Sequence, residues 1–203
     1  THQSPMMTTP PVRADTPRAR VVRYEIICRN TRMGRIVCVA NQKGGVGKTT
    51  TASNVAAGLA KSGRRTLLVD LDPQCNATTG LGGTPAETHP LVSETALSET
   101  VMSTAVTNLS LLPGSRSVRD VERLAEQARN GSMVLSNHLS CGLNAWDYCL
   151  IDCPPSLGEL TRTALAGSTE VLMPIQCEYF ALEGLTQMIE VIRDVMADQP
   201  GRL

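Results

Sequence analysis

Lysine, glycine and threonine are concentrated in residues 43–50, which read KGGVGKTT. An apolar run at 36–40 precedes this segment, and apolar residues at helical spacing follow it. Glycines let the backbone curl so that successive N–H groups converge, and a helix N-terminus adds positive potential at the same place. The Lys48 ammonium can neutralise terminal phosphates, and the Thr49 hydroxyl can bind Mg2+. The segment therefore predicts a loop that binds a nucleoside triphosphate. The residues expected to bind it are Gly44, Gly45, Val46, Gly47, Lys48, Thr49 and Thr50.

Two other apolar runs end in acidic residues. Residues 66–70 end in Asp70 and continue as DLDPQ with Asp72, and residues 148–152 end in Asp152 within IDCPPSLG. Phosphoryl transfer needs a group that orients the attacking water and cations that absorb charge on the transferred oxygens. A carboxylate at the end of an apolar strand can hold Mg2+, directly or through water. Asp70 and Asp72 alone could be turn residues, because Asp is common in turns. The presence of the 43–50 loop in the same chain favours a chemical role for them.

Strands and helices are expected to alternate along the chain. Apolar runs predict strands at 36–40, 66–70, 108–112, 148–152 and 170–175. Helical spacing predicts helices at 49–62, 117–129, 157–166 and 181–196, a weak helix at 91–105, and a loop with a short helix at 74–90. This order implies an α/β fold with a mostly parallel sheet and helices on both faces. The loop and both acidic motifs follow strands, so one composite site is expected at the carboxyl ends of the strands.

Composition sets the class of protein. The 203 residues suffice for one α/β domain, and no apolar run approaches the roughly 20 residues of a membrane span. None of the seven cysteines forms a C-x-x-C pair, so free thiols in a reducing cytoplasm are expected rather than disulfides or a zinc site. Cys153 is expected to be a small packed thiol. The three histidines, His2, His89 and His138, lack metal-ligand spacing and are assigned no role.

Together, these motifs resemble the ParA/MinD group of P-loop ATPases. The loop has the form KGGxGK[ST], with Gln42 where the ordinary motif has Gly and with an additional lysine, Lys43. DLDPQ, IDCPPSLG and the stretch QCEYFALEGL at 176–185 follow in the family's order, and the likeness runs from about residue 34 to 200. The Soj-like ParA branch fits best. The MinD-type second motif and membrane helix are absent, and so are the cluster cysteines of nitrogenase iron protein relatives.

The resemblance implies a function and a set of roles. Lys43 would reach across an ATP-dependent homodimer to the partner's phosphates, Lys48 would bind its own subunit's phosphates, and Asp72 would orient the attacking water. Thr49 and Asp152 would hold Mg2+, with Asp70 as a supporting member of the metal site. The implied protein is a Mg2+-dependent ATPase acting in chromosome or plasmid segregation with a ParB-like partner. It would bind DNA non-specifically and no membrane, and would be cytoplasmic and nucleoid-associated when ATP-bound. The alternative is a non-hydrolysing fragment or a regulatory ATP switch.

The resemblance also bears on the two ends of the chain. Residues 1–35 carry seven arginines against two acidic side chains, and residues 1–33 are expected to be a disordered basic extension. It could be a nucleic-acid arm, a targeting peptide or upstream sequence that is not native; the third is favoured because family members typically begin near Met33. Residues 34–203 are expected to form a ParA-type ATPase domain that lacks its C-terminal part, with the adenine-binding and DNA-binding residues beyond Leu203. Cys75, where the family usually has Gly, is expected to alter the turn after Asp72.

Overall fold

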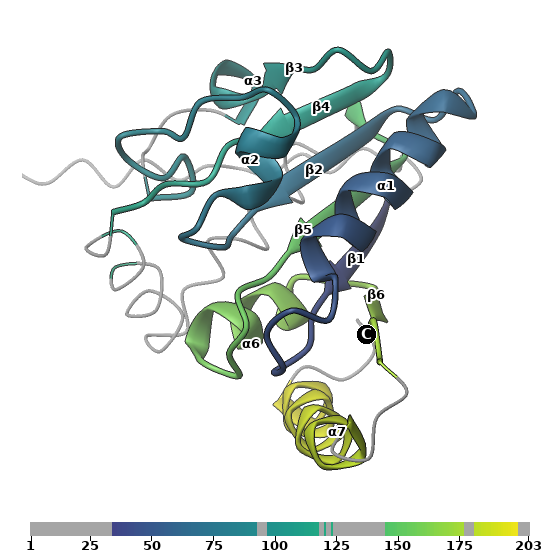
Figure 1. Cartoon of the computed structure of the whole chain (residues 1–203), viewed down its shortest axis with the longest axis vertical. Helices are drawn as coiled ribbons and strands as arrows, with labels where there is room; N and C mark the ends of the chain where they lie inside the picture. Colours follow the sequence, from purple (N-terminus) through teal and green to yellow (C-terminus); the bar gives the residue numbers. More distant parts are fainter. Residues whose placement is uncertain are drawn as a thin grey trace, which may run out of the picture.

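A computed structural model describes residues 34–92, 97–117, 120, 123, 145–176 and 181–198. Its centre is a six-stranded sheet in the order β3-β4-β2-β5-β1-β6 (Figure 1). Only the pair β3 and β4 is antiparallel, and the other neighbours run parallel. The strands are β1 Arg35–Val39, β2 Thr66–Asp70, β3 Met102–Ser103, β4 Leu109–Leu112, β5 Tyr148–Asp152 and β6 Glu170–Leu172.

Helices cover both faces of the sheet, as the sequence predicts. They are α1 Lys48–Lys61, α2 Asn76–Gly80, α3 Leu97–Thr100, α6 Glu159–Ala166 and α7 Ala181–Asp198. Side chains alternate along each strand, so Leu68 of β2 and Leu150 of β5 pack with α1. The intervening Val69 and Ile151 belong to a second cluster with residues of α6 and α7. Because both faces are covered, β2 is buried along its whole length.

Glycines set both ends of α1. Gly47 precedes the helix with φ 84°, and Gly63 follows it with φ 85° and donates its N–H to the Ala60 carbonyl. Both values lie in the left-handed region that glycine adopts without steric cost. The buried face of the helix consists of alanines, so the helix axis can approach the sheet closely; these residues are Ala52, Ala56 and Ala60.

Two sequence expectations need correction, and two others fall wholly or mostly outside the described residues. The weak helix at 91–105 is wrong: within the described residues only Leu97–Thr100 is helical, and Met102–Ser103 pairs with β4 instead, because the sheet edge offers backbone partners. The strand expected at 170–175 ends at Leu172, the last residue that pairs with β1. Residues 1–33 and most of the helix expected at 117–129 lie outside the described residues.

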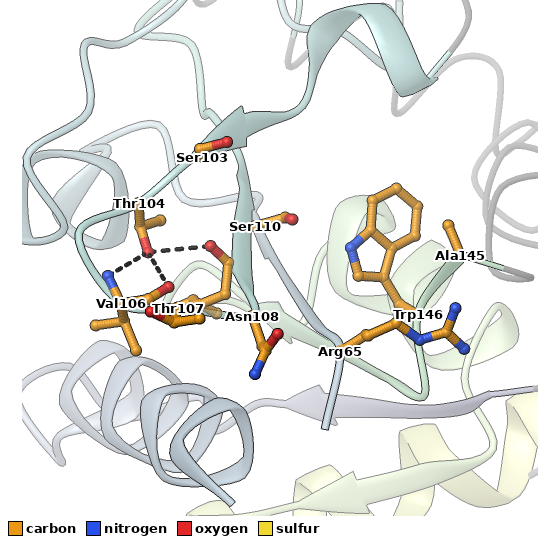
Figure 2. A pocket seen from close by; sticks show the side chains of 10 residues that line it. Arg65, Ser103, Thr104, Val106, Thr107, Asn108, Ser110, Ala145 and Trp146 are labelled. Carbon is orange, nitrogen blue, oxygen red and sulfur yellow. Dashed lines mark hydrogen bonds between the residues drawn. The ribbon is translucent and has the colours of Figure 1, made fainter. Parts of the chain in front are cut away.

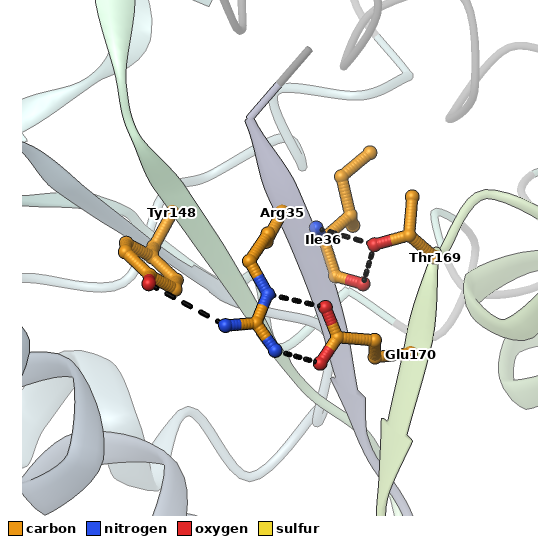
Figure 3. Close-up of polar contacts among 5 residues, drawn as sticks. All are labelled: Arg35, Ile36, Tyr148, Thr169 and Glu170. Atoms are coloured by element: carbon orange, nitrogen blue, oxygen red, sulfur yellow. Dashed lines mark hydrogen bonds and ion pairs between the residues drawn. The ribbon is translucent and has the colours of Figure 1, made fainter. Parts of the chain in front are cut away.

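A polar cluster ties together the first residues of β1, β5 and β6 (Figure 3). The Arg35 guanidinium is paired with both oxygens of Glu170 and lies 5.5 Å from the centre of the Tyr148 ring. The Thr169 hydroxyl brackets the backbone of Ile36, accepting from its N–H at 3.0 Å and donating to its carbonyl at 3.1 Å. The Arg35 ion pair is exposed, so its contribution to stability is small.

No described helix is both long and apolar enough to cross a membrane.

Candidate functional site

The parallel register brings the three predicted motifs to one edge of the sheet. Asp152 of β5 pairs with Val39 of β1 on one side and with Asp70 of β2 on the other. The 43–50 loop leaves β1 just beyond Val39, so the loop and both carboxylates lie at the carboxyl ends of adjacent strands. The composite site expected from the sequence is therefore assembled by the fold.

The 43–50 loop, called the phosphate loop below, curls at the N-terminus of α1. Gly45 and Gly47 have φ values of 75° and 84°, which a residue with a side chain adopts only with strain. The Lys48 side chain is buried, 6% exposed, and its Nζ donates to the Lys43 carbonyl at 3.1 Å. Burial lowers the pKa of Lys48, while the charges of Asp152 and Asp72 act in the opposite direction. A cation thus stands inside the loop, facing the acidic residues.

Neighbouring segments hold this loop in place. Asn41 accepts the Lys43 N–H at 3.0 Å on its side-chain oxygen and donates to the Pro174 carbonyl at 2.8 Å. Gln176, the first residue of QCEYFALEGL, donates to the Gly45 carbonyl at 3.3 Å. The fourth motif therefore begins against the loop, although residues 177–180 lie outside the described residues.

Asp152 is the most electrostatically unusual group of the site. It is fully buried, and neither carboxyl oxygen has a hydrogen-bond partner among the described residues. Burial raises its pKa to about 7; the nearby Thr49 hydroxyl, which does not reach hydrogen-bond geometry with either oxygen, and the Lys48 charge act against that rise. A buried carboxylate without partners is costly, and a hard cation that takes oxygen ligands removes the cost. The donor set of Asp152 and Thr49 therefore fits Mg2+.

Asp70 and Asp72 have different environments. Asp70 accepts from the Thr78 N–H at 2.8 Å and the Thr78 hydroxyl at 2.6 Å on one oxygen, and from the Asp72 N–H at 3.2 Å on the other. Burial raises the pKa of Asp70 even against these donors. Asp72 accepts the Gln74 N–H at 2.9 Å on one oxygen. Because both Asp70 oxygens already hold protein donors, the geometry favours a supporting role for Asp70 over direct metal binding.

The cysteines of the site are buried thiols. Cys38 and Cys153 lie with their sulfur atoms 3.4 Å apart, and this contact, together with burial, raises the pKa of Cys153. Cys75 has φ 54°, a left-handed conformation that explains why glycine suits this position. No group of three or more His, Cys, Asp or Glu side chains suited to a metal occurs within the described ranges. The described free cysteines are Cys38, Cys75, Cys149 and Cys153.

The structure adds two residues that the sequence did not single out. Thr78 binds Asp70 as described, and its hydroxyl accepts the Gly114 N–H at 2.9 Å. His89, to which no role was assigned from the sequence, is buried, and its ring contacts the Asp70 carbonyl. Neither residue lies in a periodic pattern or beside a charged motif, so no sequence signal could have found them.

A cavity of about 360 Å³ lies at the opposite, amino ends of β2, β4 and β5 (Figure 2). Its wall includes the Trp146 ring and several hydroxyls, of which Thr104 is bonded to the backbone of Val106 and Leu109. Arg65, also on its wall, is paired with Asp147 at 2.8 Å. The cavity lies away from the phosphate loop, and none of the predicted site residues lines it.

Comparison with known proteins identifies a family and relatives for the chain. A family model described as an AAA domain matches residues 34–201. Over 166 residues the chain is 43% identical to the sporulation initiation inhibitor protein Soj of Bacillus subtilis, covering 79% of this chain and 66% of that protein. Over 167 residues it is 46% identical to the chromosome partitioning protein ParA of Myxococcus xanthus, covering 79% of this chain and 58% of that protein. The chain thus spans about three fifths to two thirds of these relatives.

A similar solved structure has both ligands expected here. It is the cobyrinic acid a,c-diamide synthase of Mycobacterium smegmatis with a bound ATP analogue and magnesium. The TM-score is 0.75 at 37% identity, with 84% of this chain and 71% of that chain covered. This protein is named for a different activity from that of the partition proteins. The comparison therefore supports binding of a nucleotide and magnesium by proteins of this fold, and does not support one particular reaction.

Proposed function

The chain belongs to the ParA/Soj-like family of P-loop partition ATPases, and from this we propose that it binds ATP with Mg2+ and hydrolyses the ATP as a homodimer. The observation that carries the proposal is that a cationic loop and a buried carboxylate lie side by side at one edge of the sheet. The 43–50 loop turns at Gly45 and Gly47 and carries the Lys48 cation, and beside it Asp152 is buried without a hydrogen-bond partner among the described residues. A nucleotide phosphate with its metal ion satisfies both.

Each residue has one task in this scheme. The loop N–H groups and Lys48 hold the phosphate chain, and Thr49 and Asp152 hold Mg2+, which supplies positive charge that stabilises the transferred phosphoryl group. The Asp72 carboxylate accepts a hydrogen bond from the attacking water and so orients it. Asp70 keeps the Asp72 turn in place through the hydrogen bond to the Asp72 N–H. The site needs no covalent intermediate, because positioning and electrostatic stabilisation account for this chemistry.

The additional lysine of the loop, Lys43, makes the proposed activity depend on dimerisation. A lysine that acts on the partner's phosphates lowers the energy of the γ-phosphate charge only when two subunits face each other. This is the logic of an arginine finger, which is worth roughly 10³–10⁵ in rate. Lys43 lies at the entry of the loop, and its backbone carbonyl accepts a hydrogen bond from Lys48 Nζ at 3.1 Å; this position in the loop supports the proposed role. By similarity to Soj and ParA, the assembly would serve chromosome or plasmid segregation with a ParB-like partner and non-specific DNA.

The test separates nucleotide binding, dimerisation and turnover. Lys43→Gln should leave ATP affinity of the monomer nearly intact and remove both ATP-dependent dimerisation and hydrolysis. Asp72→Ala should bind ATP and dimerise without turnover. Lys61→Gln, an exposed lysine at the end of α1, is the matched control and should behave as the parent. Nucleotide titration, light scattering with ATP and phosphate release measure the three steps.

Two results would contradict the proposal. If Lys43→Gln dimerised with ATP like the parent, the lysine would be a local phosphate contact only. If the parent bound ATP and Mg2+ but released no phosphate under any of these conditions, the chain would be an ATP switch rather than an ATPase.

A further inference from the structure

His89 lies in the segment that follows α2 and is buried against the end of β2. Its side chain and backbone are 4% exposed, and three hydrogen bonds fix its position. Nε2 lies 3.2 Å from the Asp70 carbonyl oxygen, Nδ1 lies 3.2 Å from the Leu91 backbone nitrogen, and the His89 N–H donates to Asp120 at 2.6 Å. All polar atoms of the ring therefore have partners.

The two ring contacts require a single tautomer. The Asp70 carbonyl can only accept, so Nε2 carries the hydrogen. The Leu91 N–H can only donate, so Nδ1 is an acceptor. The neutral Nε2–H form satisfies both, and the ring bridges its own segment to the last residue of β2 with a defined orientation.

Asp70 is thereby held from two sides. Its carboxylate is bound by Thr78, whose hydroxyl in turn accepts the Gly114 N–H. Its carbonyl is bound by His89. The carboxylate oxygen that is left accepts the N–H of Asp72 at 3.2 Å, which sets where the Asp72 turn begins. A shift of the Asp70 peptide would therefore displace Asp72.

The His89 segment is anchored independently of β2. One oxygen of the buried Asp120 accepts both the His89 N–H and the Ser115 hydroxyl, the latter at 3.3 Å. Ser115 follows β4, and its hydroxyl oxygen also lies 3.4 Å from the Glu87 carbonyl, a second acceptor for the same hydrogen. The ring is thus supported by the loop after β4, so its contact with Asp70 transmits a position set outside β2.

We propose that His89 is a positioning residue for the hydrolytic site: by donating from Nε2 to the Asp70 carbonyl, it fixes the turn that aims Asp72 at the attacking water. This inference rests on the proposed ATP hydrolysis. His89 touches neither nucleotide nor water in this scheme, so it acts on the rate of the chemical step and leaves ATP binding to the phosphate loop.

Three substitutions separate the Nε2 contact from mere packing. His89→Ala removes the whole ring, His89→Asn keeps a polar group near the Nδ1 position only, and His89→Gln places an amide donor near the Nε2 position. Thr88→Ala, at the exposed neighbouring residue, is the control. Misplacement of a catalytic group by about 1 Å lowers rates roughly 100-fold. We therefore expect kcat to fall about 10- to 100-fold in the Ala and Asn variants, with KM for ATP and nucleotide Kd within about twofold of the parent.

His89→Gln should keep most of kcat, and Thr88→Ala should match the parent. All rates are measured well below the thermal midpoint of each variant and divided by the concentration of nucleotide-binding sites, so that unfolding does not mimic a catalytic loss. If kcat in the three His89 variants followed thermal stability alone, with Gln no better than Asn, His89 would be a packing residue and the inference would be wrong.

A second readout does not depend on hydrolysis. Hydrogen–deuterium exchange of the peptide covering residues 70–78 should rise in His89→Ala and His89→Asn and stay at the parent level in His89→Gln. Unchanged exchange in all three would overturn the positioning role. If exchange responded as expected while the parent itself hydrolysed no ATP, the proposed function would fail, and with it the catalytic purpose of the contact, while the contact itself would stand.

Discussion

Asp152→Asn should stabilise the metal-free protein at alkaline pH. The pKa of Asp152 rises from 3.8 to about 7 on folding because the carboxyl is buried. Between these values the folded protein binds more protons than the unfolded chain, so its free energy of unfolding falls as the pH rises, and the loss is complete above about pH 7. A difference of about 3 pKa units corresponds to roughly 4 kcal/mol. Asparagine does not ionise, so the variant is free of this loss.

Urea unfolding with and without Mg2+, at pH values from about 5 to 8, measures the effect. Without metal, the variant should exceed the parent by up to about 4 kcal/mol at pH 8, and by progressively less as the pH is lowered. With Mg2+ at pH 8, the parent should gain stability and the variant should not. Asp194→Asn, at an exposed residue paired with Arg162 at 3.0 Å, is the control and should change stability by less than about 1 kcal/mol.

Two outcomes would refute this reasoning. An advantage of Asp152→Asn that did not change with pH would show that ionisation of the buried carboxyl is not its source. Equal stabilisation of parent and variant by Mg2+ would remove Asp152 from the metal site.

Three further outcomes are expected. Lys48→Ala should lower ATP affinity at least tenfold in a nucleotide titration, because a hydrogen bond to a charged group contributes roughly 1.5–3 kcal/mol; an unchanged Kd would contradict the phosphate-loop assignment. Gly114→Ala should lower the free energy of unfolding by about 1–3 kcal/mol, since its Cβ would lie 3.1 Å from Asp70 Cγ and 3.2 Å from the Cys75 sulfur; chemical denaturation measures this, and no change would mean that the site relaxes freely. Deleting residues 1–33 should leave ATPase activity and the thermal midpoint unchanged, because their composition does not support a packed core, and a large loss of either would make them part of the fold.

The fold class, and the placement of the main candidate residues at one edge of the sheet, could be predicted from the sequence because their signals are local. A continuous apolar run such as 148–152 indicates a doubly covered parallel strand, and a glycine-rich stretch before a helix indicates a phosphate loop. Parallel strands place their carboxyl ends on one edge of the sheet. The sequence alone therefore assigns strand-end motifs such as those of Asp72 and Asp152 to a single site.

Short edge elements could not be predicted in this way. Met102–Ser103 pairs as a strand, although its surroundings suggested a weak helix, because its conformation is set by the backbone groups of β4 that lie beside it. Likewise, β6 ends at Leu172, where its pairing with β1 ends, although the apolar run continues. Pairing partners decide such cases, and a partner distant in sequence leaves no local pattern.

The sequence by itself determined which groups could bind phosphate, metal and water. Only the tertiary structure decided how they are held. The burial of Asp152 without a hydrogen-bond partner among the described residues, the two hydrogen bonds from Thr78 to Asp70 and the contact of His89 with the Asp70 carbonyl each depend on atoms brought together from segments separated by loops. A hydrogen bond requires its two partners within about 3 Å and in the right direction, and residue type and spacing along the chain carry no information on that distance.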